Sequence, residues 1–286
     1  MDLNTELQKL TSEQLHNIVV QAIDSLYEEI KDLSLSEEIR AEIIQIAKVC
    51  TKFGIINQPT KLKSIEDNSS SNKKLMLYTA RWLKRLVTHR NQSYILREAP
   101  PLKDRDVIRD PALEFVLKRY YEENKIDITS EEIDLAINSH DLLMSIENIQ
   151  GHLLEAYIAE NICKEPYNFM WLEGEVVKAV DFGLHIPASN AQPDKEDYIY
   201  LLQIKNKYNT ENSSSSVVRN VAVKKIEKWN RLSKKKQKGI NVPVYNWNDL
   251  NKIIENFTEN SPNLSEEGYL LFLENVLRTN PKIINI

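Results

Sequence analysis

A carboxylate and a Gln-x-Lys triplet lie on two neighbouring segments of extended character in the second half of the chain. Asp181 interrupts residues 177–184, where Val and Phe predict a strand, although Asp is depleted in strands. Gln203 and Lys205 follow the apolar run at residues 198–202. Because side chains alternate across a strand, this pair shares one face and places an amide oxygen beside an ammonium group. Neighbouring strands are about 4.8 Å apart, so Asp181 and Gln203 could share a divalent cation.

A further oxygen ligand, Glu155, lies within residues 151–159, which read as a largely apolar helix. A carboxylate on that face is expensive to bury unless it faces a metal ion or another cation. Simpler interpretations exist for each side chain alone: Glu155 as a solvated helix residue, and Asp181 as the cap of a turn near Gly183. The order of helix Glu, strand Asp and Gln-x-Lys triplet along the chain favours a metal site, with Mg²⁺ as the cofactor.

Polar and basic residues follow the second predicted strand, and their side chains suit a nucleic acid. Residues 206–216 are rich in Ser, Thr and Asn, which can donate to phosphate oxygens, and Arg219 can bind guanine in bidentate fashion. Residues 217–240 hold nine basic residues and one acidic residue, a charge of +8 in a chain of net charge −5. A basic patch on an acidic body is compatible with binding phosphates at one face. The alternatives are a flexible Ser/Asn linker and a solvated Lys-rich helix end.

The amphipathic helix predicted at residues 74–90 adds a second group of basic residues, which we expect to hold the DNA backbone. The candidate DNA contacts are Asn206, Lys207, Asn209, Thr210, Asn212, Ser213, Ser214, Ser215, Ser216, Arg219, Lys224, Lys228, Arg81, Lys84 and Arg85.

The elements before about residue 139 are expected to be helical, because apolar residues recur there at helical spacing. Residues 1–140 are therefore predicted to form a helical N-terminal region that clamps DNA, dimerises or supports the core.

The remaining residues, 141–286, are predicted to form the catalytic core. Residues 146–162 read as a helix, residues 169–186 and 198–208 as strands, and the basic segment that follows as a helix. Two more helices are expected within residues 248–277. The predicted fold class is α/β (α+β), with a mixed sheet flanked by helices.

The helix Glu, the strand Asp and the x-x-Lys triplet together resemble the PD-(D/E)XK nuclease superfamily. The resemblance implies that Asp181 is the main metal ligand and that Gln203 occupies the second ligand position. It also implies that Lys205 is the catalytic lysine, which positions or activates the attacking water. Glu155 would be the helix carboxylate that contacts the metal, directly or through water.

A narrower similarity is carried by residues 202–219, with the Lys-Trp pair at 228–229 and the Asn-Trp pair at 246–247. This pattern resembles the SinI/AvaII group of type II restriction endonucleases and covers roughly residues 148–250. The resemblance implies a sequence-specific endonuclease that cuts double-stranded DNA at a short GC-rich site as a homodimer. It also implies a restriction-modification system with a cognate DNA methyltransferase.

The chain departs from the superfamily pattern at two positions. Val180 stands where the pattern has Pro, and Gln203 stands where it has Asp or Glu. An amide can offer its oxygen to magnesium but contributes no charge. The alternatives are a catalytically weak or silent DNA-binding protein on a nuclease fold, a DNA repair nuclease of the same superfamily, and an unrelated helical interaction protein.

Composition excludes several other classes of protein. The start of the chain has no signal-peptide pattern, and no stretch approaches the roughly 18 apolar residues of a membrane span, so a cytoplasmic protein is expected. Cys50 and Cys163 are the only cysteines, too few for a disulfide framework. The five histidines lack metal-ligand spacing, and there is no glycine-rich phosphate loop.

Overall fold

The chain divides into two compact units in the computed structural model, which describes residues 1–59, 70–91, 111–173, 176–188, 197–207 and 226–283. The first unit joins residues 1–93 to residues 155–268, and the second joins residues 94–154 to residues 269–286. The N-terminal helices and the sheet therefore share one unit. The functional boundary expected near residue 140 stays a prediction.

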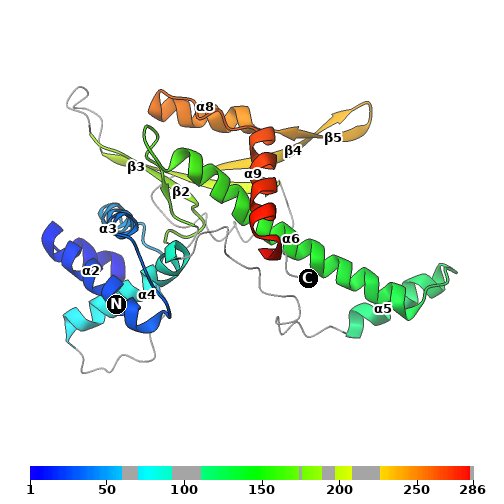
Figure 1. Ribbon diagram of the computed structural model, residues 1–286, viewed down its shortest axis with the longest axis horizontal. Helices are drawn as coiled ribbons and strands as arrows, with labels where there is room; N and C mark the ends of the chain where they lie inside the picture. The colour runs from blue at the N-terminus through cyan, green and yellow to red at the C-terminus, as the bar shows by residue number, and fades with distance from the viewer. Residues whose placement is uncertain (60–69, 92–110, 174–175, 189–196, 208–225, 284–286) are drawn as a thin grey trace. The chain divides into compact units, whose positions relative to one another are not determined.

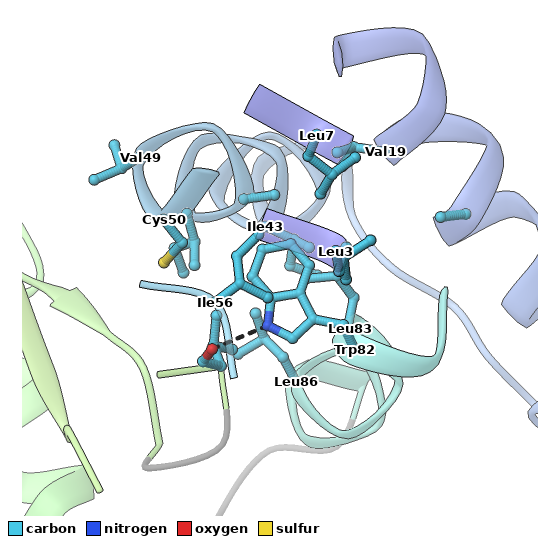
Figure 2. Packing of buried hydrophobic residues seen from close by; sticks show 14 of the residues in the cluster. Leu3, Leu7, Val19, Ile43, Val49, Cys50, Ile56, Trp82, Leu83 and Leu86 are labelled. Carbon is cyan, nitrogen blue, oxygen red and sulfur yellow. Dashed lines mark hydrogen bonds between the residues drawn. The ribbon is translucent and has the colours of Figure 1, made fainter. Parts of the chain in front are cut away.

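Four helices form the N-terminal part of the first unit: α1 (Leu3–Gln8), α2 (Ser12–Glu29), α3 (Glu37–Lys52) and α4 (Ser71–Asn91). Side-chain caps define where three of them begin, because Asp2, Thr11 and Ser36 each accept a hydrogen bond from a first-turn N–H. Their apolar faces meet in the core drawn in Figure 2, which includes Leu3, Leu7, Val19, Ile43, Val49, Cys50, Ile56, Trp82, Leu83 and Leu86.

A five-stranded mixed sheet forms the rest of this unit, with strands in chain order across the sheet. Its strands are β1 (Met170–Trp171), β2 (Phe182–Ile186), β3 (Tyr198–Lys207), β4 (Ile226–Gln237) and β5 (Ile240–Tyr245). All neighbours pair antiparallel except β3 and β4, which are parallel (Figure 1). The predicted α/β (α+β) class, with helices and a mixed sheet, is confirmed.

The N-terminal helices cover one face of the sheet. Ile199 and Leu201 of β3 share that face and belong to the same buried core as the helices. Trp82 of α4 donates its indole N–H to the carbonyl of Val176 at 2.9 Å, the bond drawn as a dashed line in Figure 2. The helical region and the sheet are thus joined by burial and by a specific hydrogen bond.

Two helices cover the opposite face: α8 (Trp247–Thr258) and the last part of α6 (Ser130–Ile162). The ring centroids of Tyr200 and Phe257 are 4.2 Å apart, and those of Trp229 and Trp247 are 5.1 Å apart. Tyr157 of α6 contacts Trp247 edge to face at 5.7 Å. Aromatic contacts therefore fix β3 and β4 against these helices.

The second unit consists of helices: α5 (Pro111–Glu123), the first part of α6, most of α9 (Glu266–Thr279) and the short η2 (Pro281–Ile283). Its small core is built on Leu153, Val276 and Ile283, and Tyr269 donates its hydroxyl to the Gln150 carbonyl at 3.1 Å. Within the described ranges, the helices lack the length and apolar character needed to cross a membrane.

The strand expected from residue 169 to residue 186 is interrupted. Residues 176–179 form turns between β1 and β2, residues 180–181 have no regular structure, and β2 begins only at Phe182. Val176, Val177 and Val180 are buried in the core, so their apolar character reflects packing of a loop rather than strand pairing.

The helix expected in the basic segment is wrong, because the described part of that segment is β4. Its first half pairs with β3, and a tight turn then leads into β5, which the sequence did not predict. The helices expected from residue 130 and up to residue 162 are one continuous helix, α6.

Candidate active site

Glu155 lies on the last part of α6, where the helix packs against the sheet. Its neighbours Ala156 and Ile158 are fully buried, whereas Glu155 keeps partial exposure. Trp171 of β1 donates its indole N–H to Glu155 Oε2 at 3.3 Å. This hydrogen bond restricts the orientation of the Glu155 carboxylate.

Asp181 lies directly before β2 and is bound to β3. Its Oδ2 accepts a hydrogen bond from the backbone N–H of Ile204 at 2.6 Å, and its own N–H donates to the Leu202 carbonyl at 3.0 Å. The side chain is 7% exposed. The two hydrogen bonds flank Gln203, so the loop that delivers Asp181 holds its carboxylate beside the Gln-x-Lys triplet.

Gln203 and Lys205 both lie in β3, two residues apart, and therefore share one face of the sheet. Gln203 is buried and Lys205 is exposed. The Lys205 ammonium interacts electrostatically with both Asp181 and Glu155. The structure thus brings the four residues proposed from the sequence together at one end of the sheet, while their catalytic roles stay predictions.

The two carboxyl groups are held in surroundings that disfavour their charges. Burial raises the pKa of Asp181 to about 6, against the lowering effects of the Ile204 N–H and the Lys205 ammonium. Burial and then the Asp181 charge raise the pKa of Glu155 well above its ordinary range. Two neighbouring carboxylates with too little compensating positive charge are typical of a cation site.

This donor set fits a magnesium ion, which prefers carboxylate oxygens and keeps several waters. Glu155 and Asp181 supply two carboxylates, and Gln203 adds an amide oxygen. Over the ranges that the structure describes, no three His, Cys, Asp or Glu side chains converge as a ready ligand set. The fit therefore depends on the amide, on water and on substrate oxygens to complete the coordination shell.

A second group of residues supports Glu155 indirectly, through contacts with Trp171. The guanidinium of Arg90, in α4, lies 4.9 Å from the centroid of the Trp171 ring and donates to the Trp171 carbonyl at 2.8 Å. Arg90 also forms an ion pair with Glu173, which His89 contacts as well. The Arg90 and Glu173 side chains are 9% and 4% exposed. The N-terminal helices thus support the Trp that holds Glu155.

The sequence did not assign these supporting residues to the site. One available signal was the indole N–H, since a buried Trp usually finds an acceptor. Which acceptor it finds depends on the fold.

The described candidates for DNA contact fall into two groups. Asn206, Lys207 and Lys228 lie in β3 and β4, and Asn206 accepts a hydrogen bond from Arg231 Nε at 2.8 Å. The three candidates in α4, Arg81, Lys84 and Arg85, line a pocket of about 450 Å³ beside residues 57–59, and Lys84 forms an ion pair with Glu29. The candidates outside the described residues are Asn209, Thr210, Asn212, Ser213, Ser214, Ser215, Ser216, Arg219 and Lys224.

Comparison with known proteins assigns the family. The model of the SinI restriction endonuclease family matches residues 64–279. The chain belongs to the SinI restriction endonuclease family. The resemblance predicted from the Gln-x-Lys strand and the residues after it is therefore confirmed. The match also extends into the helical region, beyond the roughly 148–250 on which the resemblance was based.

Two curated proteins are similar to part of the chain. The type II restriction enzyme SinI of Salmonella infantis is 38% identical over 154 residues, which are 53% of this chain and 56% of that enzyme. The type II restriction enzyme Eco47I of Escherichia coli is 37% identical over 153 residues, with the same coverage of both chains. The chain thus spans about half the length of the curated relatives it matches.

Proposed function

We propose that this chain is a site-specific endonuclease that hydrolyses phosphodiester bonds of double-stranded DNA with a divalent metal ion. The observation that carries the proposal is the placement of Glu155, Asp181 and Lys205 around one end of the sheet. Family membership supports it, because the curated relatives carry the name of type II restriction enzymes. We accordingly propose that this chain also cleaves DNA at a defined sequence.

Asp181 and Glu155 would hold Mg²⁺ through their carboxylates, and Gln203 would add its amide oxygen. When bound, the metal supplies Lewis-acid stabilisation of the negative charge that develops at the scissile phosphate. The hydrogen bonds from Ile204 and Trp171 keep the two carboxylates in place before metal or DNA arrives. Orienting partners of this kind commonly change metal affinity or activity by about 10–100-fold when removed.

Lys205 is exposed and interacts electrostatically with both carboxylates, so its ammonium could reach a phosphate oxygen or the attacking water. A fixed positive charge at this position stabilises the pentacovalent phosphate as charge accumulates on its oxygens.

The DNA duplex would be held by basic residues on both sides of this site. We propose that Lys207, Lys228 and the α4 residues Arg81, Lys84 and Arg85 contact phosphates, and that residues 206–224 contribute base and backbone contacts. A duplex with related half-sites also favours action as a homodimer. A cognate DNA methyltransferase that protects host sites would complete the restriction-modification system.

Cleavage of a mixed-sequence plasmid tests the proposal. Purified protein with Mg²⁺ should produce discrete fragments of reproducible length, and chelation of the metal with EDTA should stop the reaction. A smear of random fragments would argue for a non-specific or repair nuclease. DNA binding without any cleavage in Mg²⁺ or Mn²⁺ would instead identify a catalytically silent protein, the role that the neutral Gln203 side chain favours.

A further inference from the structure

The hairpin of β4 and β5 extends beyond the described part of β3 as a two-stranded ribbon. The last described register pair between β3 and β4 is Lys207 with Leu232, and among the described residues 233–237 pair with β5 alone (Figure 1). The turn at Lys238 and Gly239 has φ values of 49° and 84°, as tight two-residue hairpins require. We call residues 233–244 the ribbon.

The ribbon carries four lysines and no acidic residue, in a chain with a net charge of −5. Lys234, Lys235, Lys236 and Lys238 are all exposed. Within the parts of the chain that the structure describes, no carboxylate forms an ion pair with any of them. This concentration of positive charge lacks a neutralising partner in the described fold, so it suits an anionic ligand.

The register places two of these lysines on the same side of the sheet as the candidate active site. In the parallel pair, Gln203 lies beside Lys228 and Lys205 beside Asn230. Because side chains alternate along a strand, Lys234 and Lys236 continue the side that bears Lys205. Their partners across the hairpin are the uncharged Pro243 and Asn241.

The opposite side of the ribbon differs in charge. Only one lysine, Lys235, lies there, and its partner across the hairpin is Val242. Closer to the sheet, the same side presents Arg231, which is bound to Asn206 and Glu266. The active-site side of the ribbon therefore has more lysine charge available to bind a ligand than the opposite side.

We propose that Lys234 and Lys236 bind phosphates of the DNA that flanks the cleavage site, so that the duplex follows the ribbon away from Lys205. This inference rests on the proposed endonuclease function. Asn230 and Lys236 are six residues apart, about 20 Å at roughly 3.3 Å per residue. The contacts of Lys234 and Lys236 would then lie about four to six base pairs from the scissile phosphate, at roughly 3.4 Å per base pair. A two-stranded ribbon also fits the width of the DNA major groove.

Salt-dependent DNA binding tests the proposal. The probe is a random-sequence 30-base-pair duplex, titrated without metal between about 50 and 200 mM NaCl by fluorescence anisotropy. The variant is Lys234→Gln with Lys236→Gln. The control is Lys235→Gln with Lys252→Gln, which removes the same charge from the other side of the ribbon and from an exposed position on α8.

We expect the Lys234/Lys236 variant to bind about tenfold more weakly at 0.1 M salt. We also expect the slope of log K against log salt to become shallower by about 1.8, for two lost phosphate contacts. The control should change both quantities by less than half as much. Equal effects in variant and control, with wild-type protein that binds and cleaves DNA, would overturn the ribbon contact and leave the proposed function intact. Wild-type protein that neither binds nor cleaves would overturn the proposed function instead.

Discussion

Replacing Asp181 with Asn should stabilise the metal-free protein while removing the proposed cleavage of DNA. Asp181 is 7% exposed, and burial raises its pKa to about 6 from an ordinary 3.8, despite the hydrogen bond from Ile204 and the charge of Lys205. Above about pH 6, the folded protein therefore keeps a carboxylate ionised in surroundings that favour its neutral form. Asn retains an oxygen for the Ile204 N–H and removes the charge, including its repulsion of Glu155.

The pKa of Asp181 sets the size of this effect. At 1.36 kcal/mol for each tenfold change in the ionisation constant, a rise from 3.8 to about 6 corresponds to about 3 kcal/mol. A carboxyl group whose pKa is raised by folding stabilises the protein at low pH, and this contribution is lost as the pH rises through the folded pKa. The unfolding free energy of metal-free wild-type protein should therefore fall between about pH 4 and pH 7. The Asp181→Asn variant does not lose stability in this way, because it has no carboxyl group to ionise. Its unfolding free energy should therefore exceed that of wild type by about 1–3 kcal/mol at pH 7.5.

Urea unfolding in EDTA at about pH 4 and at pH 7.5 measures this difference. The gain from Asp181→Asn should be small at pH 4 and large at pH 7.5. Asp127→Asn serves as the control, because Asp127 is exposed and its substitution should change the unfolding free energy by less than about 0.5 kcal/mol. A variant less stable than wild type at pH 7.5 would refute the reasoning, as would the same gain at both pH values.

Three further substitutions probe how the site is supported. Trp171→Phe removes the hydrogen bond to Glu155 but keeps an aromatic ring, so cleavage rate or metal affinity should fall about 10–100-fold with little change in thermal stability. Arg90→Met leaves Glu173 buried without its main partner and should lower the unfolding free energy by about 3 kcal/mol in urea titrations; an unchanged midpoint would contradict the ion pair. Gln203→Glu should tighten Mg²⁺ binding in calorimetric titrations, and unchanged affinity would argue against a ligand role for this position.

The strand that carries the triplet could be predicted because its signals are local. An apolar run followed by Gln203 and Lys205 predicts a strand at residues 198–208, and β3 spans Tyr198–Lys207. The alternation of side chains then places the amide and the ammonium on one face without knowledge of the fold. The strand character of the residues after Asp181 is equally local, and β2 begins at Phe182.

The basic segment could not be assigned in this way. Lysines fit a helix as well as an exposed strand, and a run of them has no apolar period to indicate either. What makes the segment a strand is its parallel pairing with β3, where Trp229 lies beside Ile204. That pairing joins residues about 25 positions apart, so propensity gives way to tertiary contacts.

The residues that support Glu155 could not be predicted from local sequence patterns either. Trp171 and Glu155 are 16 residues apart, and Arg90 reaches Trp171 across 81 residues. Sequence patterns identify residues that need partners, such as an indole N–H or an arginine on a helix face. The fold decides which partners they meet, and here it joins the N-terminal helices to Glu155 of the candidate active site.

Cleavage by a Lys205→Met variant tests the central claim most directly. Single-turnover cleavage of a plasmid in Mg²⁺ should fall by at least about a thousandfold, since the charge that stabilises the transition state is lost. Binding of duplex DNA should change by less than about tenfold, and Lys178→Met, at an exposed position outside the triplet, should cleave like wild type. Wild-type rates from Lys205→Met would contradict the assignment of Lys205 and the active site built around it.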